Sequence, residues 1–180
     1  GRALENAASE GNLEIVKLLT DRPEPVPTKV ADEAIALAVQ HQRLTVLDFL
    51  LKKGLKAGCA RLAYALMESK TSIAEILLNN GADLNEMVAI DPERKFKGGA
   101  ALHLVVNAGR LDETKWLLEK GAKPDLADPV FGLTPLHIAA KFERPEAIEI
   151  MKCLLAAGAN PNRVSNDQAT PDSLEKTILL

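Results

Sequence analysis

The strongest constraint on the fold of this 180-residue chain is a leucine pair that is separated by two residues from a glycine and that recurs along the sequence. Glycine after an apolar stretch is a common helix end, because it adopts the left-handed conformation at little cost. These helix ends recur on average every ~34 residues, and a period in that range indicates stacked copies of one structural unit. A fifth leucine pair, Leu18-Leu19, is followed by proline instead of glycine. The five ends lie at Pro23, Gly54, Gly81, Gly121 and Gly158.

The copy that ends at Gly158 shows what one unit contains. Thr134 precedes Pro135, and this pair is typical of a helix start, because threonine caps backbone amides and proline fits the first helical position. The small and apolar residues of 136–140 predict a short first helix, and residues 146–155 predict an amphipathic second helix. The unit is therefore expected to consist of helix, turn, helix, glycine stop and extended loop.

The run Thr134-Pro-Leu-His-Ile-Ala139 resembles the signature of the ankyrin repeat, and the run Gly81-Ala-Asp-Leu-Asn85 resembles the turn that ends each copy. The resemblance implies an all-α solenoid of about five helix-turn-helix repeats plus a partial sixth. It implies one domain over residues 1–180, with repeats at 2–28, 29–57, 58–97, 98–130 and 131–166 and a partial copy at 167–180.

The apolar pattern predicts where the helices and their buried faces lie. In the first repeat, Leu4, Ala7 and Ala8 are expected to be buried, together with Leu13, Val16, Leu18 and Leu19. The three prolines within 21–27 end that repeat. A helix is expected at 31–39, where Asp32 and Glu33 in its first turn would favour the helix dipole. The other expected helices are 44–51, 61–69, 72–79, 101–107 and 112–119.

Two segments are longer than the repeat requires, and insertions in such arrays map to loops on one face. Residues 87–99 lengthen the loop, or finger, before the fourth repeat by roughly seven residues relative to a standard repeat. Extra residues at 143–145 separate or extend the two helices of the fifth repeat.

The composition argues against several classes of function. A formal net charge of −3 does not suit a general nucleic-acid binder, and no apolar run is long enough to span a bilayer. The sequence contains no phosphate-binding loop, zinc helix or nucleophile elbow, so we expect no enzyme, no cofactor and no metal. Two cysteines, Cys59 and Cys153, are expected to stay reduced in an intracellular protein, cytoplasmic or nuclear. We expect a monomer.

Two pairs of residues acquire a role from the resemblance alone. His103 and His137 occupy the same place in two repeats, where histidines of this family bond backbone groups between neighbouring repeats. Asn85 and Asn162 stand at a turn where an asparaginyl hydroxylase modifies ankyrin asparagines in some organisms.

The resemblance also implies a surface for a partner protein or peptide. In this family the first helices and the fingers line a concave face that binds other proteins. The positions expected to contact a partner from the ends of first helices are Met67, Asn107, Lys141 and Phe142. Those expected from the fingers are Ile90, Arg94, Lys95, Phe96, Lys97, Val130 and Phe131. Basic residues beside Phe96 suit an acidic peptide or a phosphate on a partner.

Other interpretations of these residues stay open. Phe142 suits equally a structural role in which it covers the extra residues at 143–145, and the finger at 87–99 suits a tolerated insertion. The whole chain suits a protein-interaction scaffold, or the part of a larger enzyme or effector that selects its substrate. A third alternative is a structural module that self-associates through the apolar end at 178–180.

Overall fold

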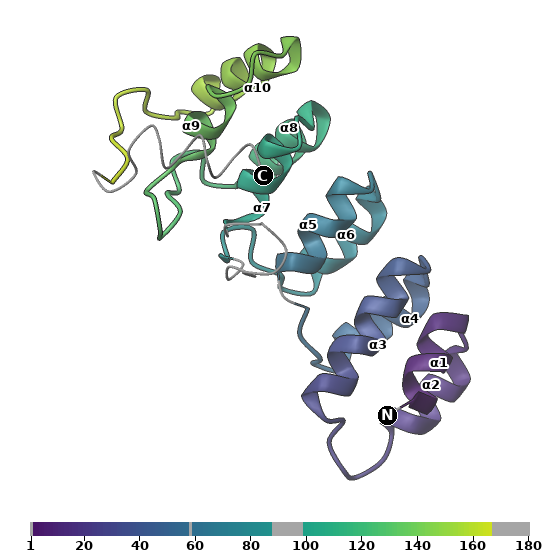
Figure 1. Ribbon diagram of the computed structural model, residues 1–180. Helices are drawn as coiled ribbons and strands as arrows, with labels where there is room; N and C mark the ends of the chain where they lie inside the picture. Colours follow the sequence, from purple (N-terminus) through teal and green to yellow (C-terminus); the bar gives the residue numbers. More distant parts are fainter. Residues whose placement is uncertain (1, 58, 88–98, 167–180) are drawn as a thin grey trace. The chain divides into compact units, whose positions relative to one another are not determined.

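The computed structural model describes residues 2–57, 59–87 and 99–166 (Figure 1). The described residues form ten α-helices, which confirms the all-α fold expected from the sequence. The chain divides into two compact units, Gly1–Asp83 and Leu84–Leu180. The single domain over 1–180 stays a prediction.

The first unit is built from helix pairs that lie in two layers (Figure 1). Its helices are α1 (Arg2–Glu10), α2 (Leu13–Thr20), α3 (Thr28–Gln40), α4 (Leu44–Lys52), α5 (Cys59–Met67) and α6 (Thr71–Asn79). The helices of each pair pack together, and α3 also packs between α1 and α5. On the other layer, α4 packs between α2 and α6. First helices therefore form one layer and second helices form the other.

The second unit repeats this arrangement with two pairs. They are α7 (Ala101–Asn107) with α8 (Leu111–Glu119), and α9 (Pro135–Ala139) with α10 (Pro145–Ala156). The first helices α7 and α9 pack together, as do the second helices α8 and α10. Of the extra residues at 143–145, Pro145 extends the second helix, because it occupies the first helical position of α10, whereas Glu143 and Arg144 lie between the two helices.

The recurring glycines end the second helices as predicted. Gly54, Gly81, Gly121 and Gly158 all have φ between 86° and 94°, the left-handed conformation. In each copy the amide of the residue after the glycine donates to the carbonyl of the first leucine of the pair, at 3.0 to 3.3 Å. The first leucine of each of these pairs also belongs to the hydrophobic core, since Leu50, Leu77, Leu117 and Leu154 are all buried.

The first leucine pair behaves differently from the other four. Leu4, Ala7 and Ala8 of α1 are buried as expected, and so is Val16 of α2. Leu18, however, is 70% exposed, so the prediction that it is buried is wrong. Val16 and Leu18 are two positions apart and point about 200° apart around the helix, so only one of them can face the core.

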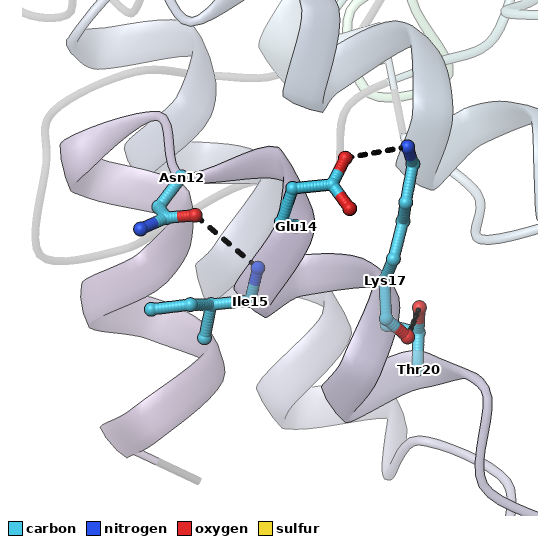
Figure 2. Close-up of polar contacts among 5 residues, drawn as sticks. All are labelled: Asn12, Glu14, Ile15, Lys17 and Thr20. Atoms are coloured by element: carbon cyan, nitrogen blue, oxygen red, sulfur yellow. Dashed lines mark hydrogen bonds and ion pairs between the residues drawn. The ribbon is translucent and has the colours of Figure 1, made fainter.

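Polar side chains hold both ends of α2 (Figure 2). Asn12 Oδ1 accepts a hydrogen bond from the Ile15 amide at 3.2 Å, which satisfies one of the donors left open at a helix start. Glu14 and Lys17 form an ion pair at 2.7 Å on the exposed side. At the other end Thr20 donates to the carbonyl of Val16 at 2.9 Å and to that of Lys17 at 3.2 Å, of which Figure 2 draws the second. These bonds stabilise a short helix that ends at Thr20, three residues before the first proline.

The next helix begins earlier than the sequence suggested. Helix α3 starts at Thr28, directly after Pro27, which has φ −56° and ψ 137° and takes the cap position. The Pro27 carbonyl accepts hydrogen bonds from the amides of Val30 and Ala31 at 2.9 and 3.0 Å, so the first helical turn closes before the alanine that the sequence suggested as the start. As a result Asp32 and Glu33 lie beyond the first turn, and the expected favourable effect on the helix dipole there is wrong.

Basic side chains link neighbouring first helices of the first unit. Arg43, which precedes α4, donates from Nε to the carbonyl of Ser9 at the end of α1, at 2.8 Å. Its stem lies against Gly11, where a Cβ atom would come within 2.8 Å of Arg43 Cδ. Lys70, at the same place before α6, donates to the carbonyl of Gln40 at 3.4 Å. These cations satisfy carbonyls at helix ends, where the dipole favours positive charge.

Replacing Arg43 by methionine keeps most of the stem and removes the bond to the Ser9 carbonyl. We expect the free energy of unfolding to fall by about 1 kcal/mol, as is usual for a half-buried hydrogen bond. Urea denaturation followed by circular dichroism measures the change. Arg22→Met, at an exposed position, is the matched control, and an equal loss in both variants would contradict the assigned role.

Candidate binding surface

In the first unit, the layer of first helices exposes two large side chains of α5. Met67, one of the predicted contact residues, is 40% exposed at the end of the helix. Tyr64 lies one turn earlier and is equally exposed, at 40%. Residues three apart on a helix share a face, so the two side chains form one apolar strip. Tyr64 was not among the predicted contact residues, although a tyrosine one turn before Met67 is a signal visible in the sequence.

In the second unit, the predicted contact residues at the ends of the first helices differ in exposure. Asn107 closes α7 and is exposed. Lys141 follows α9 and is half-buried. Because α7 packs on α9, these two positions belong to neighbouring helix ends.

Phe142 is half-buried, and part of its cover comes from the extra residues of the fifth repeat. The guanidinium carbon of Arg144 lies 4.0 Å from the centre of the Phe142 ring, a cation–π contact. Arg144 also reaches the turn of the preceding repeat, where a Cβ atom on Gly109 would lie 3.1 Å from its Nη1. This geometry favours the structural interpretation of Phe142, and a role of the residue in partner binding stays a prediction.

A buried carboxylate shapes the finger at 128–133. Asp128 is only 6% exposed, and its two oxygens accept hydrogen bonds from three backbone amides. The donors are the amides of Val130 at 3.0 Å, Phe131 at 2.8 Å and Leu133 at 2.7 Å. The Asp128 amide donates in turn to the Leu133 carbonyl at 2.8 Å. The finger is therefore a closed loop around one side chain.

This loop presents the residues predicted for partner contact at its tip. Val130 is 40% exposed, while Phe131 is half-buried. Asn166 holds the loop from the following finger, since its backbone amide donates to the Phe131 carbonyl at 2.9 Å. Val130 and Phe131 are predicted contact residues, whereas the role of Asp128 was not predicted, because an aspartate before proline resembles any turn residue. The remaining finger positions, Ile90, Arg94, Lys95, Phe96 and Lys97, lie outside the described residues.

The two equivalent histidines have structural partners. His103 Nδ1 accepts from the Ala100 amide at 3.2 Å, and its Nε2 lies 3.3 Å from the Leu133 carbonyl of the next repeat. His137 Nδ1 accepts from the amide of Thr134 at 3.2 Å and from its hydroxyl at 2.8 Å. The predicted backbone bond between neighbouring repeats is thereby confirmed for His103.

Burial lowers the pKa of His103 below its ordinary value, although the Leu133 carbonyl opposes this by holding the Nε2 proton. Protonation would also place a hydrogen on Nδ1 against the Ala100 amide. The unfolded chain therefore binds more protons than the folded chain when the pH falls below the unfolded pKa. The contribution of His103 to stability is full above that pKa and is lost as the pH falls.

We expect the free energy of unfolding to decrease when the pH falls from about 7.5 to about 5.5, a range that spans the ordinary histidine pKa. Because one proton is involved, this part of the slope is at most about 1.4 kcal/mol per pH unit. Urea denaturation at several pH values measures it. In His103→Asn this part of the slope should vanish, and a slope that persists unchanged would exclude His103 as its source.

Asparagine and aspartate side chains at the glycine turns bond the next repeat of the second unit. Asn85 Oδ1 accepts from the Lys123 amide at 2.9 Å. Asp125, at the same place in the next copy, accepts from the Asn160 amide at 2.8 Å. Asn85 therefore has a structural role, and its hydroxylation stays a prediction, as does that of Asn162.

Within residues 2–57, 59–87 and 99–166, no group of three or more histidine, cysteine, aspartate or glutamate side chains is placed to hold a metal ion. No helix among those residues has the length and apolar character needed to cross a membrane.

Comparisons with known proteins agree with this architecture. A family model described as ankyrin repeats in three copies matches residues 4–88, and another described as ankyrin repeats in many copies matches residues 102–155. A crystal structure of an ankyrin repeat domain from Acinetobacter baumannii AYE superposes with a TM-score of 0.66 at 22% identity. The match covers 98% of this chain and 95% of that one.

Two human proteins are related in sequence. Ankyrin repeat and SOCS box protein 16 is 32% identical over 170 residues, which cover 94% of this chain. Ankyrin repeat and MYND domain-containing protein 1 is 32% identical over 117 residues, which cover 63% of this chain. The chain spans only 34% and 12% of the length of these curated relatives. Since the two family models match both units and the helix pairs stack as repeats, the chain belongs to the ankyrin repeat family.

Proposed function

We propose that this chain is a protein-recognition module that binds a partner protein or peptide through its first helices and fingers. The ankyrin repeat fold is typically a non-catalytic interaction module, which supports a binding role in place of an enzymatic one. The observation that carries the proposal is the finger at 128–133. A side chain exposed on a loop that is already ordered loses little conformational entropy on binding.

The contact residues proposed for the second unit are Val130, Phe131, Asn107, Lys141 and Phe142, together with the finger positions outside the described residues. For the first unit we propose Met67 and add Tyr64. A few apolar anchors in such a surface supply most of the affinity, and charges around them set specificity and association rate.

The test compares this chain with its Val130→Glu variant as paired baits in lysate of the source cells. We expect a protein that is enriched by the parent and lost with the variant, because a buried carboxylate at an apolar contact is costly. Ile148→Glu is the matched control, since Ile148 is 58% exposed on α10 of the same unit. A protein that both variants retain would show that the finger at 128–133 is not the contact.

Substrate selection within a larger enzyme or effector is the second candidate. It is favoured by relatives whose names join ankyrin repeats to a SOCS box or a MYND domain, and by the fraction of their length that the chain spans. The length of the full gene distinguishes it from a free-standing module. The monomeric state, the cytoplasmic or nuclear location, the absence of a cofactor and the absence of nucleic-acid partners stay predictions, and so does the self-association alternative.

A further inference from the structure

The second helix of the first repeat exposes an isoleucine at a position that later copies bury. Ile15 of α2 lies eight residues before Pro23, which ends its copy, and it is 44% exposed. The residues eight positions before Gly54, Gly81 and Gly158 are all aliphatic, and each of them is at most 1% exposed. These three residues are Val46 of α4, Ile73 of α6 and Ile150 of α10.

The hydrogen bonds at the helix starts support this alignment within the first unit. The residue at the N-cap of each second helix donates from its amide to the carbonyl of an alanine in the preceding first helix, at 2.7 to 2.9 Å. These cap residues are Asn12, Arg43 and Lys70. The aliphatic residue in question follows each cap by three positions, so it occupies the same place on all three helices.

The cover of this position comes from the repeat that precedes it. Helix α2 packs against the following helix α4, yet Ile15 stays exposed. Helix α10 packs against the preceding helix α8, and no second helix follows it among the described residues, yet Ile150 is buried. A preceding neighbour therefore buries this position, and a following neighbour does not.

Two more residues of the first repeat are uncovered in the same way. Leu18 lies one turn after Ile15 on the same face of α2 and is 70% exposed, whereas its equivalent Phe49 on α4 is half-buried. On the layer of first helices, Ala3 is exposed, whereas Ala34 at the same place in α3 is fully buried. We call the surface of Ala3, Ile15 and Leu18 the Ile15 face. The cap bond from the Ile15 amide to Asn12 holds its central turn in place (Figure 2).

The chemistry and the size of the Ile15 face indicate what covers it. The end of a repeat array normally turns a polar face to water, and this face is apolar. Two aliphatic side chains and an alanine are too few for a stable interface between separate molecules. A helix pair in the same polypeptide needs far less contact area, because its effective concentration is high. The face also continues the packing of second helices that joins α2, α4 and α6.

We propose that a further ankyrin-type helix pair precedes residue 1 in the whole protein and covers the Ile15 face. The second helix of that pair lies against Ile15 and Leu18, as α2 lies against α4, and its first helix lies against Ala3. The side chains that it turns to this face are small and aliphatic. Helices α1 and α2 then form an internal repeat of a longer array. The inference does not depend on the proposed partner surface.

The coding sequence before residue 1 identifies the segment to be tested. The protein extended by one repeat, about 33 residues, is compared with residues 1–180 by hydrogen–deuterium exchange. We expect the amides of α2 to exchange at least about tenfold more slowly in the extended protein, because a helix packed on both sides opens less often.

A double variant tests whether the Ile15 face makes this contact. In the extended protein, Ile15→Ala/Leu18→Ala should lower the midpoint of thermal unfolding by at least about 5 °C, because it removes buried aliphatic groups. In residues 1–180 it should change the midpoint by less than about 2 °C, because both side chains are exposed there. Leu44→Ala, at an exposed leucine of α4, is the matched control and should change the midpoint of neither protein by more than about 2 °C.

Three results would overturn the inference. The first is a coding sequence with no such repeat before residue 1. The second is an equal effect of the double variant on both proteins, since the added segment would then not cover the Ile15 face. The third is a dimer of residues 1–180 in analytical ultracentrifugation that the double variant dissociates, because the occupant would then be a second copy of the chain.

Discussion

Replacing Asp128 by alanine is expected to lower the free energy of unfolding of the second unit by about 3 kcal/mol. The substitution leaves the amides of Val130, Phe131 and Leu133 without their acceptor, and a buried donor that loses its partner costs about 1–3 kcal/mol. The total cost is less than three times the cost of one unpaired donor, because the opened finger lets water reach some of these amides. Urea denaturation monitored by circular dichroism measures the change.

Two further variants sharpen this prediction. Asp128→Asn keeps one acceptor oxygen but turns the other position into a donor that faces a backbone amide, so it should be nearly as unstable as the alanine variant. Asp112→Ala removes an exposed carboxylate from α8 of the same unit and should change the free energy of unfolding by less than about 0.5 kcal/mol. Equal stability of all three variants would mean that Asp128 does not organise the finger.

Truncating Leu50 to alanine should cost about 3 kcal/mol, within the range measured for leucine in a packed core. Leu50 is fully buried in the second-helix layer, where α4 packs between α2 and α6, so its loss opens a cavity shared by neighbouring repeats. Leu44→Ala, on the same helix but exposed, should cost less than about 1 kcal/mol.

Chemical denaturation of both leucine variants separates the core contribution from the intrinsic helix preference of alanine, because the substitution is the same in the two positions. A loss of similar size at Leu44 and Leu50 would contradict the assigned packing.

Much of the fold followed from local sequence. Thr134 and Pro135 predicted the start of α9, and the structure has the Thr134 hydroxyl at the cap and Pro135 at the first helical position. Each glycine of the leucine pairs adopts the left-handed conformation that ends a helix. These features depend on a few neighbouring residues, so a sequence pattern is enough to predict them.

The errors concern properties that depend on what lies beside a helix. The pattern around Leu18 matches later copies, but Leu18 points about 200° away from Val16, and Val16 is the residue that faces the core. Helix α3 starts at Thr28 because the Pro27 carbonyl accepts the first helical hydrogen bonds, whereas the pattern favoured a start at the later alanine.

The binding residues were harder to predict than the fold. Val130 is presented on an ordered finger because amides at three positions converge on Asp128, and convergence of that kind is not visible in a linear pattern. Arg144 covers Phe142 because the turn between them places the guanidinium carbon of Arg144 4.0 Å from the centre of the Phe142 ring. Tyr64 was not predicted for a simpler reason, because contacts were expected only at the ends of the first helices and Tyr64 lies inside α5.

The polar bonds between repeats, such as those of Asn85 and Asp125, join residues 38 and 35 positions apart, close to one repeat length. Interactions of this kind give a low contact order, so an ordered pair needs to recruit only its neighbour and not a distant part of the chain. Stability in such an array is a sum over adjacent pairs. Duplication of one segment can therefore lengthen the protein without redesign of the rest, and a new finger arrives with each copy.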